Sequence, residues 1–160
     1  MIYEPRPGDF GVIRSTGIAA RAIQIGTVSR WNHAFIYIGN GKIIEAIPSK
    51  GLIISDMSKY DKIAWSQHTI LTDAQREIIV EKAKSLFGKP YGFLDILVLS
   101  LRILGLKILK GKFVEKLAIR QGIICSELEA ICYAAAGIQL VDKPEYLTTP
   151  GDLAEYLIYQ

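Results

Sequence analysis

The stretch SRWNHAFIYIGNGKIIEAIP, residues 29–48, decides the fold of this chain. It holds two apolar runs that are rich in β-branched and aromatic residues, and the turn-forming tripeptide Gly-Asn-Gly at 39–41 separates them. This pattern predicts two antiparallel strands joined by a tight turn. One of the two histidines of the chain, His33, stands directly before the first run, and Glu45 lies within the second.

The geometry of the turn decides whether His33 and Glu45 can meet. A two-residue turn would place Glu45 opposite Ile36, so that the two polar side chains would point to opposite faces of the sheet. A three-residue turn, with Gly41 in the left-handed region as a bulge, would place Glu45 opposite Phe35 and on the face of His33. The apolar pattern does not choose between them, because both faces of these strands are apolar. We predict the bulged register.

The remaining strand-like segments gather in the first half of the chain. Apolar or β-branched runs bounded by Gly, Pro or polar residues predict further strands over 9–15, 51–57 and 62–68, with a short helix over 17–26.

The hydrophobic period changes to a helical one after Thr72. Thr72 or Asp73 is available as the N-cap of a helix that Gly88 ends, and its predicted apolar positions are Ile78, Ile79, Ala83 and Leu86. Two further helices are predicted over 93–109 and 125–137. Segregated strands and helices predict an α+β fold: one domain over residues 1–160, with a small antiparallel sheet from the N-terminal half packed against helices from the C-terminal half.

Composition and charge exclude several classes of protein. Half of the residues are hydrophobic and 22% are charged, which is typical of a folded domain. The net charge of +3 is small and the basic residues are scattered, so nucleic acid is not the expected partner. The N-terminus shows no secretory signal, which leads us to expect a cytoplasmic protein.

The segment 93–109 is the most membrane-like part of the chain. It contains Asp95, Arg102 and Lys107, which argues against a transmembrane span. A buried amphipathic helix is the simplest interpretation, and a surface that contacts lipid or an acyl chain at the periphery of a membrane is the alternative.

The two cysteines differ in their positions within one predicted helix. Cys125 and Cys132 are too far apart along the helix for a disulfide, and the chain lacks the paired ligands of a structural zinc site. Cys125 opens the helix, where the helix dipole favours a thiolate, although Glu127 and Glu129 would partly offset this effect. Cys125 is therefore the candidate nucleophile, and Cys132 is expected to pack in the core.

A nucleophilic thiol needs a base, and the candidates are His33 and His68. His33 stands at the mouth of an apolar strand that would hold its ring, whereas His68 has no acid nearby in sequence and is expected at the surface. Glu45 is the first acid after His33 and could fix the tautomer of the imidazole, with Asp56 in reserve.

Three segments together resemble a known family: NHAFIYIGNGKIIEA at 32–46, GKPYGFLDI at 88–96 and ICSELEAICYAAAGI at 124–138. They are similar to the YiiX-like cysteine hydrolases, the circularly permuted branch of the NlpC-type papain-like superfamily, in which the histidine and its polar partner precede the cysteine. Lecithin:retinol acyltransferase-like proteins share this order. The similarity runs from about Gly8 to Gly137.

The resemblance implies a role for each matching residue. Cys125 would be the nucleophile, His33 the general base and Glu45 the group that orients His33. Tyr91 matches a Pro-Tyr position whose hydroxyl lies near the nucleophile and could help to hold an oxyanion. An acid often follows that tyrosine in the family, whereas this chain has Gly92, and a packed aromatic ring is the alternative interpretation of Tyr91.

The activity implied is hydrolysis of an amide, either in a cell-wall peptide or in an isopeptide, through an acyl-enzyme thioester. The partner would be a peptide or another acyl-containing substrate, and no metal or organic cofactor is expected. A lipid acyltransferase or thioesterase that uses the same triad, and a binding module without catalysis, are the alternatives.

Overall fold

The computed structural model describes residues 3–15, 29–48, 50–67, 69–92 and 122–158 of the chain. The helices predicted over 17–26 and 93–109, and His68, lie outside the described residues.

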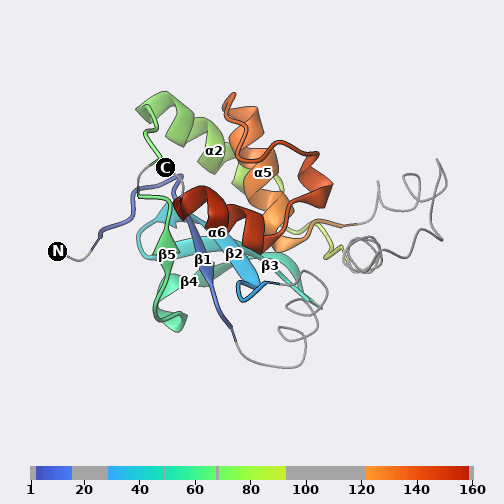
Figure 1. The fold of residues 1–160 in the computed structure, drawn as a ribbon. Coiled ribbons are helices and arrows are strands. Elements are labelled where there is room, and N and C mark those ends of the chain that lie inside the picture. The colour runs from blue at the N-terminus through green and yellow to red at the C-terminus, as the bar shows by residue number, and fades with distance from the viewer. Residues whose placement is uncertain (1–2, 16–28, 49, 68, 93–121, 159–160) are drawn as a thin grey trace.

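A five-stranded sheet forms the first layer of the fold (Figure 1). The order of its strands is β4-β3-β2-β1-β5, and every neighbouring pair is antiparallel. Its strands are β1 (Phe10–Ile13), β2 (His33–Gly39), β3 (Lys42–Ile47), β4 (Gly51–Asp56) and β5 (Ala64–Trp65). All predicted strands are present, although β5 is shorter than the run over 62–68 suggested.

The β2–β3 hairpin has the predicted register, but it reaches that register by a different route. Glu45 lies opposite Phe35, which places Glu45 and His33 on one face of the sheet. Asn40 and Gly41 form a two-residue turn with φ of 51° and 69°, and the extra residue is a bulge in β2 between Tyr37 and Gly39. An Asn-Gly turn with two positive φ angles suits the twist of the strands, and the bulge supplies the shift of one residue.

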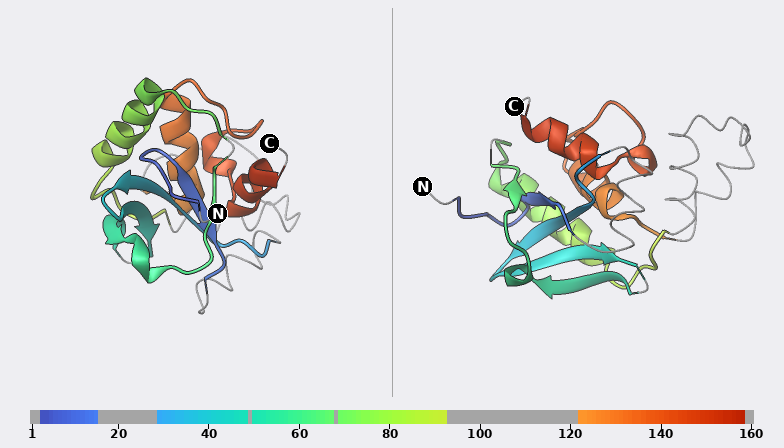
Figure 2. Two further views of the ribbon diagram at one scale, coloured as in Figure 1. Left: turned by 90° about the vertical axis from the view of Figure 1, so that its left-hand side faces the viewer. Right: turned by 60° about the horizontal axis from the view of Figure 1, so that its bottom comes forward.

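Three helices in the described residues lie over one face of the sheet (Figure 2). They are α2 (Asp73–Ser85), α5 (Cys125–Ala135) and α6 (Pro150–Ile158), and two short 3-10 turns, η1 and η3, occupy Met57–Lys59 and Glu145–Leu147. The fold is therefore α+β, as the sequence predicts, with α6 as an element that was not predicted. No helix of the described ranges has the length and apolar character needed to cross a bilayer.

The predicted N-cap of α2 is confirmed. The Thr72 hydroxyl accepts a hydrogen bond from the Gln75 N–H at 3.2 Å, and the Gln75 side chain accepts one from the Thr72 N–H at 3.0 Å. This reciprocal capping satisfies two backbone donors that the first turn would otherwise leave unpaired. Of the four apolar positions named from the sequence, Ile78 is 44% exposed, and Val80 takes the inward position instead.

The sheet separates two hydrophobic clusters of unequal size. The larger one fills the space between the helices and the face that carries Phe10, Ala34, Ile36 and Ile44. The smaller one lies on the opposite face around Phe35, where the segment after β4 covers the sheet. Both faces of β2 are thus buried, which explains why the apolar pattern alone did not determine its register.

Two glycines with positive φ provide a matched test of the packing at the sheet edge. Gly51 has a φ of 75°, and a Cβ on it would lie 2.3 Å from the carbonyl oxygen of Lys89. Gly41 has a φ of 69° with nothing within 4 Å of its Cβ position. We expect Gly41→Ala to lower the free energy of unfolding by about 1 to 2 kcal/mol, the cost of a left-handed conformation. Gly51→Ala should cost more, roughly 3 kcal/mol or above, because the backbone must also move.

Urea denaturation of both variants measures this difference. Equal losses of stability in the two variants would contradict the close approach of Gly51 to Lys89.

Candidate active site

Cys125 is the first residue of α5, as predicted, and it lies against the start of β2. The helix is capped by Glu127, whose Oε2 accepts a hydrogen bond from the Ile124 N–H at 3.3 Å. The Cys125 sulfur accepts a hydrogen bond from the backbone N–H of Ala34, the residue next to His33. The side chain is almost fully buried, with 3% exposure. Packing of α5 on β2 therefore brings the thiol to the strand end that carries His33.

His33 and Glu45 are hydrogen-bonded to each other inside the protein. The distance from His33 Nε2 to Glu45 Oε2 is 2.8 Å, and both residues are buried. An ionised carboxylate only accepts hydrogen bonds, so a neutral His33 carries its proton on Nε2. This arrangement leaves the lone pair of Nδ1 available to accept a proton from another group.

Glu45 also binds two residues that the sequence did not single out. Lys59 Nζ donates a hydrogen bond to Oε1, and the Tyr60 hydroxyl donates one to Oε2 at 2.6 Å. The Tyr60 ring stacks on Phe35, with ring centroids 5.2 Å apart. No spacing or motif marks this lysine and tyrosine, because they reach Glu45 only through the turn that follows β4.

The surroundings of Glu45 keep it ionised. Burial alone would raise its pKa, but hydrogen bonds from His33, Lys59, Ser55 and Tyr60 outweigh burial and lower the pKa to about 2. Asp56, the alternative partner for His33 predicted from the sequence, instead forms an ion pair on the exposed edge of the sheet. Its Oδ1 lies 2.6 Å from Lys42 Nζ.

The thiol of Cys125 has a high pKa, contrary to the expectation from its position at a helix N-terminus. Burial is the largest cause, and with the charge of an ionised Glu129 it raises the pKa to about 12, although backbone hydrogen bonds from Ala34 and Ser126 act in the opposite direction. The cost of burying a thiolate therefore exceeds the stabilisation that the helix end supplies. Of the two acids named from the sequence, Glu129 acts on the thiol in the predicted direction wherever it is ionised.

Glu129 itself is fully buried one helical turn beyond Cys125. Neither of its carboxyl oxygens has a hydrogen-bond partner among the described residues. Burial raises its pKa well above the ordinary value, which favours the protonated, neutral carboxyl.

Tyr91 and Cys132 are both buried in the larger hydrophobic cluster. Tyr91 is buried, forms an isolated parallel bridge with Ile123, and lies near enough to Cys125 for a thiolate there to raise the tyrosine pKa, although burial is the larger cause. Cys132 is completely buried in the larger cluster, which confirms its predicted place in the core. Both cysteines are free thiols.

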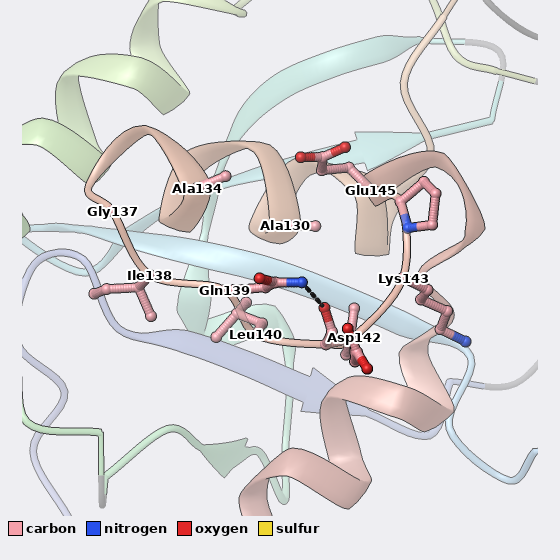
Figure 3. A pocket seen from close by; sticks show the side chains of 11 residues that line it. Ala130, Ala134, Gly137, Ile138, Gln139, Leu140, Asp142, Lys143 and Glu145 are labelled. Atoms are coloured by element: carbon pink, nitrogen blue, oxygen red, sulfur yellow. Dashed lines mark hydrogen bonds between the residues drawn. The ribbon is translucent and has the colours of Figure 1, made fainter.

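One cavity borders α5, and another lies beside the sheet. The first, of about 650 Å³, lies at the C-terminal end of α5 along residues 137–145 (Figure 3). Its wall contains none of the candidate site residues; Gln139 there donates a hydrogen bond to the Val141 carbonyl at 3.1 Å. The second, of about 760 Å³, is lined in part by Lys59 and Tyr60, the two residues that hydrogen-bond to Glu45 together with His33.

Comparison with solved structures identifies a relative in fold. The chain is similar to a protein described as the metalloprotein yiiX, DUF1105, from Escherichia coli O157:H7. The TM-score is 0.60 at 19% sequence identity, and the similarity covers 86% of this chain and 70% of that one. No protein-family model matches the chain, and a search of curated proteins found no significant match. At this identity the likeness shows a shared, YiiX-like α+β fold.

The low pKa of Glu45 makes the protein sensitive to acid. Its folded pKa of about 2 lies below the ordinary value of 4.5, so the ionised carboxylate contributes stability above about pH 4.5 that is lost as the pH falls towards 2. We expect Glu45→Gln to be less stable than the wild type by on the order of 3 kcal/mol near neutral pH. Chemical denaturation as a function of pH should show this gap closing below about pH 4.5, and a gap that is constant from pH 7 to pH 2 would contradict the assignment.

The raised pKa of Glu129 predicts that the stability of the protein has the opposite dependence on pH. The unfolded chain releases this proton near the ordinary pKa of 4.5, whereas the folded chain retains it. Stability is therefore lost as the pH rises above about 4.5, by up to about 1.4 kcal/mol per pH unit. We expect Glu129→Gln to become progressively more stable than the wild type between about pH 5 and pH 8. Glu77→Gln, on the exposed face of α2, is the control and should show no such trend.

Proposed function

We propose that this protein is a cysteine hydrolase in which Cys125, His33 and Glu45 act as a catalytic triad. The observation that carries the proposal is the buried 2.8 Å hydrogen bond between His33 and Glu45 at the strand end against which the Cys125 sulfur rests. A histidine with one nitrogen bound to a carboxylate, on a strand against which a helix packs that begins with a cysteine, provides the parts of an activated nucleophile.

The chemistry follows from these positions. His33 Nδ1 accepts the thiol proton while the sulfur attacks a substrate carbonyl, and Glu45 stabilises the imidazolium that forms. Backbone N–H groups at the start of α5, with the Tyr91 hydroxyl, would hold the tetrahedral oxyanion. The leaving group takes the proton from His33, and water then hydrolyses the thioester on Cys125.

Because the pKa of the Cys125 thiol is high, the proposed reaction depends on His33 to remove the thiol proton. A buried thiol with a pKa of about 12 holds almost no thiolate at neutral pH. Removal of its proton must therefore accompany the attack on substrate, in contrast to enzymes that maintain a preformed thiolate–imidazolium pair.

The fold supports this proposal at the level of class. A YiiX-like fold is consistent with a papain-like hydrolase, and we propose an amide of the cell-wall peptide or isopeptide type as the substrate. The related structure is described as a metalloprotein. Within the described ranges of this chain no three His, Cys, Asp or Glu side chains gather as metal ligands, and the proposal carries over no metal.

Two other functions remain as alternatives. A lipid acyltransferase or thioesterase would use the same triad, and the apolar segment 93–109 that motivates this alternative lies outside the described residues. A binding module would retain the fold without chemistry.

Matched cysteine variants test the triad. With a muropeptide, an isopeptide and an acyl ester as substrates, we expect Cys125→Ala to abolish turnover, and His33→Gln to lower kcat/KM by about 10²- to 10⁴-fold through loss of the general base. Cys132→Ala should keep its activity, because that thiol is confined to the core. Mass spectrometry of the wild type should detect an acyl adduct on Cys125.

The substrate that is turned over distinguishes the hydrolase from the lipid enzyme. Absence of turnover and of adduct with all three substrates would support the binding module and overturn the proposed enzyme.

A further inference from the structure

The cavity of about 760 Å³ is lined by three separate segments of the chain. Arg14 and its neighbours at the end of β1, together with Trp31, form one wall, and residues 59–62 after β4 form the other. These segments lie at the end of β1, just before β2 and after β4, and these three strands belong to one sheet.

This cavity adjoins the candidate active site through shared residues. Lys59 and Tyr60 line it and also hydrogen-bond to Glu45. Ile13, which lines it too, pairs with His33 across the β1–β2 ladder. The Tyr60 ring centroid lies 5.7 Å from that of His33. A molecule in this cavity would therefore lie beside the His33–Glu45 pair.

The lining of the cavity is rich in positive charge. It contains the cations Arg14, Lys59 and Lys62 against the single carboxylate of Asp61. Lys59 is neutralised by its ion pair with Glu45. Within the described part of the chain, neither Arg14 nor Lys62 forms an ion pair, so two cations face one carboxylate.

The Arg14 guanidinium and the Lys62 backbone each have a defined position. The Arg14 guanidinium lies 4.8 Å from the centroid of the Trp31 ring, a cation–π distance that orients its planar fork of donors. Lys62 has a φ of 55°, an uncommon conformation for a residue other than glycine, asparagine or aspartate. Backbone strain of this kind persists where the surrounding structure enforces it.

We propose that this cavity is a subsite for a carboxylate of the substrate, with Arg14 and Lys62 as its charged contacts. The inference rests on the proposed function, because it places the carboxylate in the acyl substrate that Cys125 attacks. It narrows the substrate class to amides or esters that carry a free carboxylate near the scissile bond.

The net charge of the subsite favours a carboxylate over a phosphate. Arg14 and Lys62, which form no ion pair within the described ranges, together with the carboxylate of Asp61 leave one positive charge to balance a single negative one. A phosphate monoester carries nearly two charges at neutral pH and would meet the Asp61 carboxylate without a matching cation. The planar guanidinium of Arg14 also suits the two oxygens of a carboxylate.

Binding of a small probe tests the subsite without any need for turnover. The chain has two tryptophans, so Trp65→Phe leaves Trp31 as the only indole, next to Arg14. In this background we expect succinamate, which has one carboxylate and one amide, to change the Trp31 fluorescence saturably. Succinamide, its neutral analogue, should have no effect at the same concentrations. Cys125→Ala should still bind succinamate, which separates this result from any failure of the proposed catalysis.

Charge variants identify the contacts. Arg14→Gln and Lys62→Gln alter exposed side chains, and each should weaken succinamate binding by about 5-fold or more, the loss expected when a charged hydrogen-bond partner is removed. Lys50→Gln, an exposed lysine away from the cavity, is the matched control and should leave the affinity unchanged. An equal response to succinamate and succinamide, unchanged affinity in both charge variants, or tighter binding of inorganic phosphate would each overturn the proposal.

Discussion

The register of the β2–β3 hairpin is the constraint on which the candidate site depends. The side chains of a strand alternate between its faces, so a slip of one residue would move Glu45 to the helix-covered face and away from His33. The bulge between Tyr37 and Gly39 supplies the one-residue offset that the tight Asn-Gly turn does not provide. The bulge in β2 thus makes possible the buried hydrogen bond between His33 and Glu45 near the other end of the hairpin.

Two buried glutamates near the site have opposite protonation states. Glu45 is surrounded by the donors of His33, Lys59 and Tyr60 and remains a carboxylate. Glu129 has no hydrogen-bond partner among the described residues and keeps its proton. Desolvation opposes the ionisation of both carboxyl groups. It is outweighed at Glu45, where hydrogen-bond donors stabilise the carboxylate, but not at Glu129. The structure therefore has a fixed negative charge beside His33 and a neutral acid beside the thiol.

The same sheet separates Cys125, the proposed nucleophile, from the residues around the proposed subsite. Cys125 is carried by α5, which covers the face with the larger hydrophobic cluster. Lys59 and Tyr60 belong to the segment that covers the smaller cluster on the opposite face. The two groups approach each other at the beginning of β2, where His33 and Ala34 point to opposite faces. The proposed subsite and the proposed nucleophile are thus carried by different layers that meet at one strand end.

By itself, the sequence determined the features that depend on local pattern. These are the hairpin, the capped start of α2, the start of α5 at Cys125 and the α+β segregation, because turn residues, capping residues and periodicity act over a few positions. It also named His33 and Glu45, and the register that joins them, although it placed the offset at Gly41.

Only the tertiary structure decided the rest of the site. The contacts of Lys59 and Tyr60 with Glu45, the complete burial of Glu129 and the high pKa of the Cys125 thiol all arise where distant segments pack together. Solvent exclusion and charge at such a point are properties of the assembled layers, and no short stretch of residues encodes them.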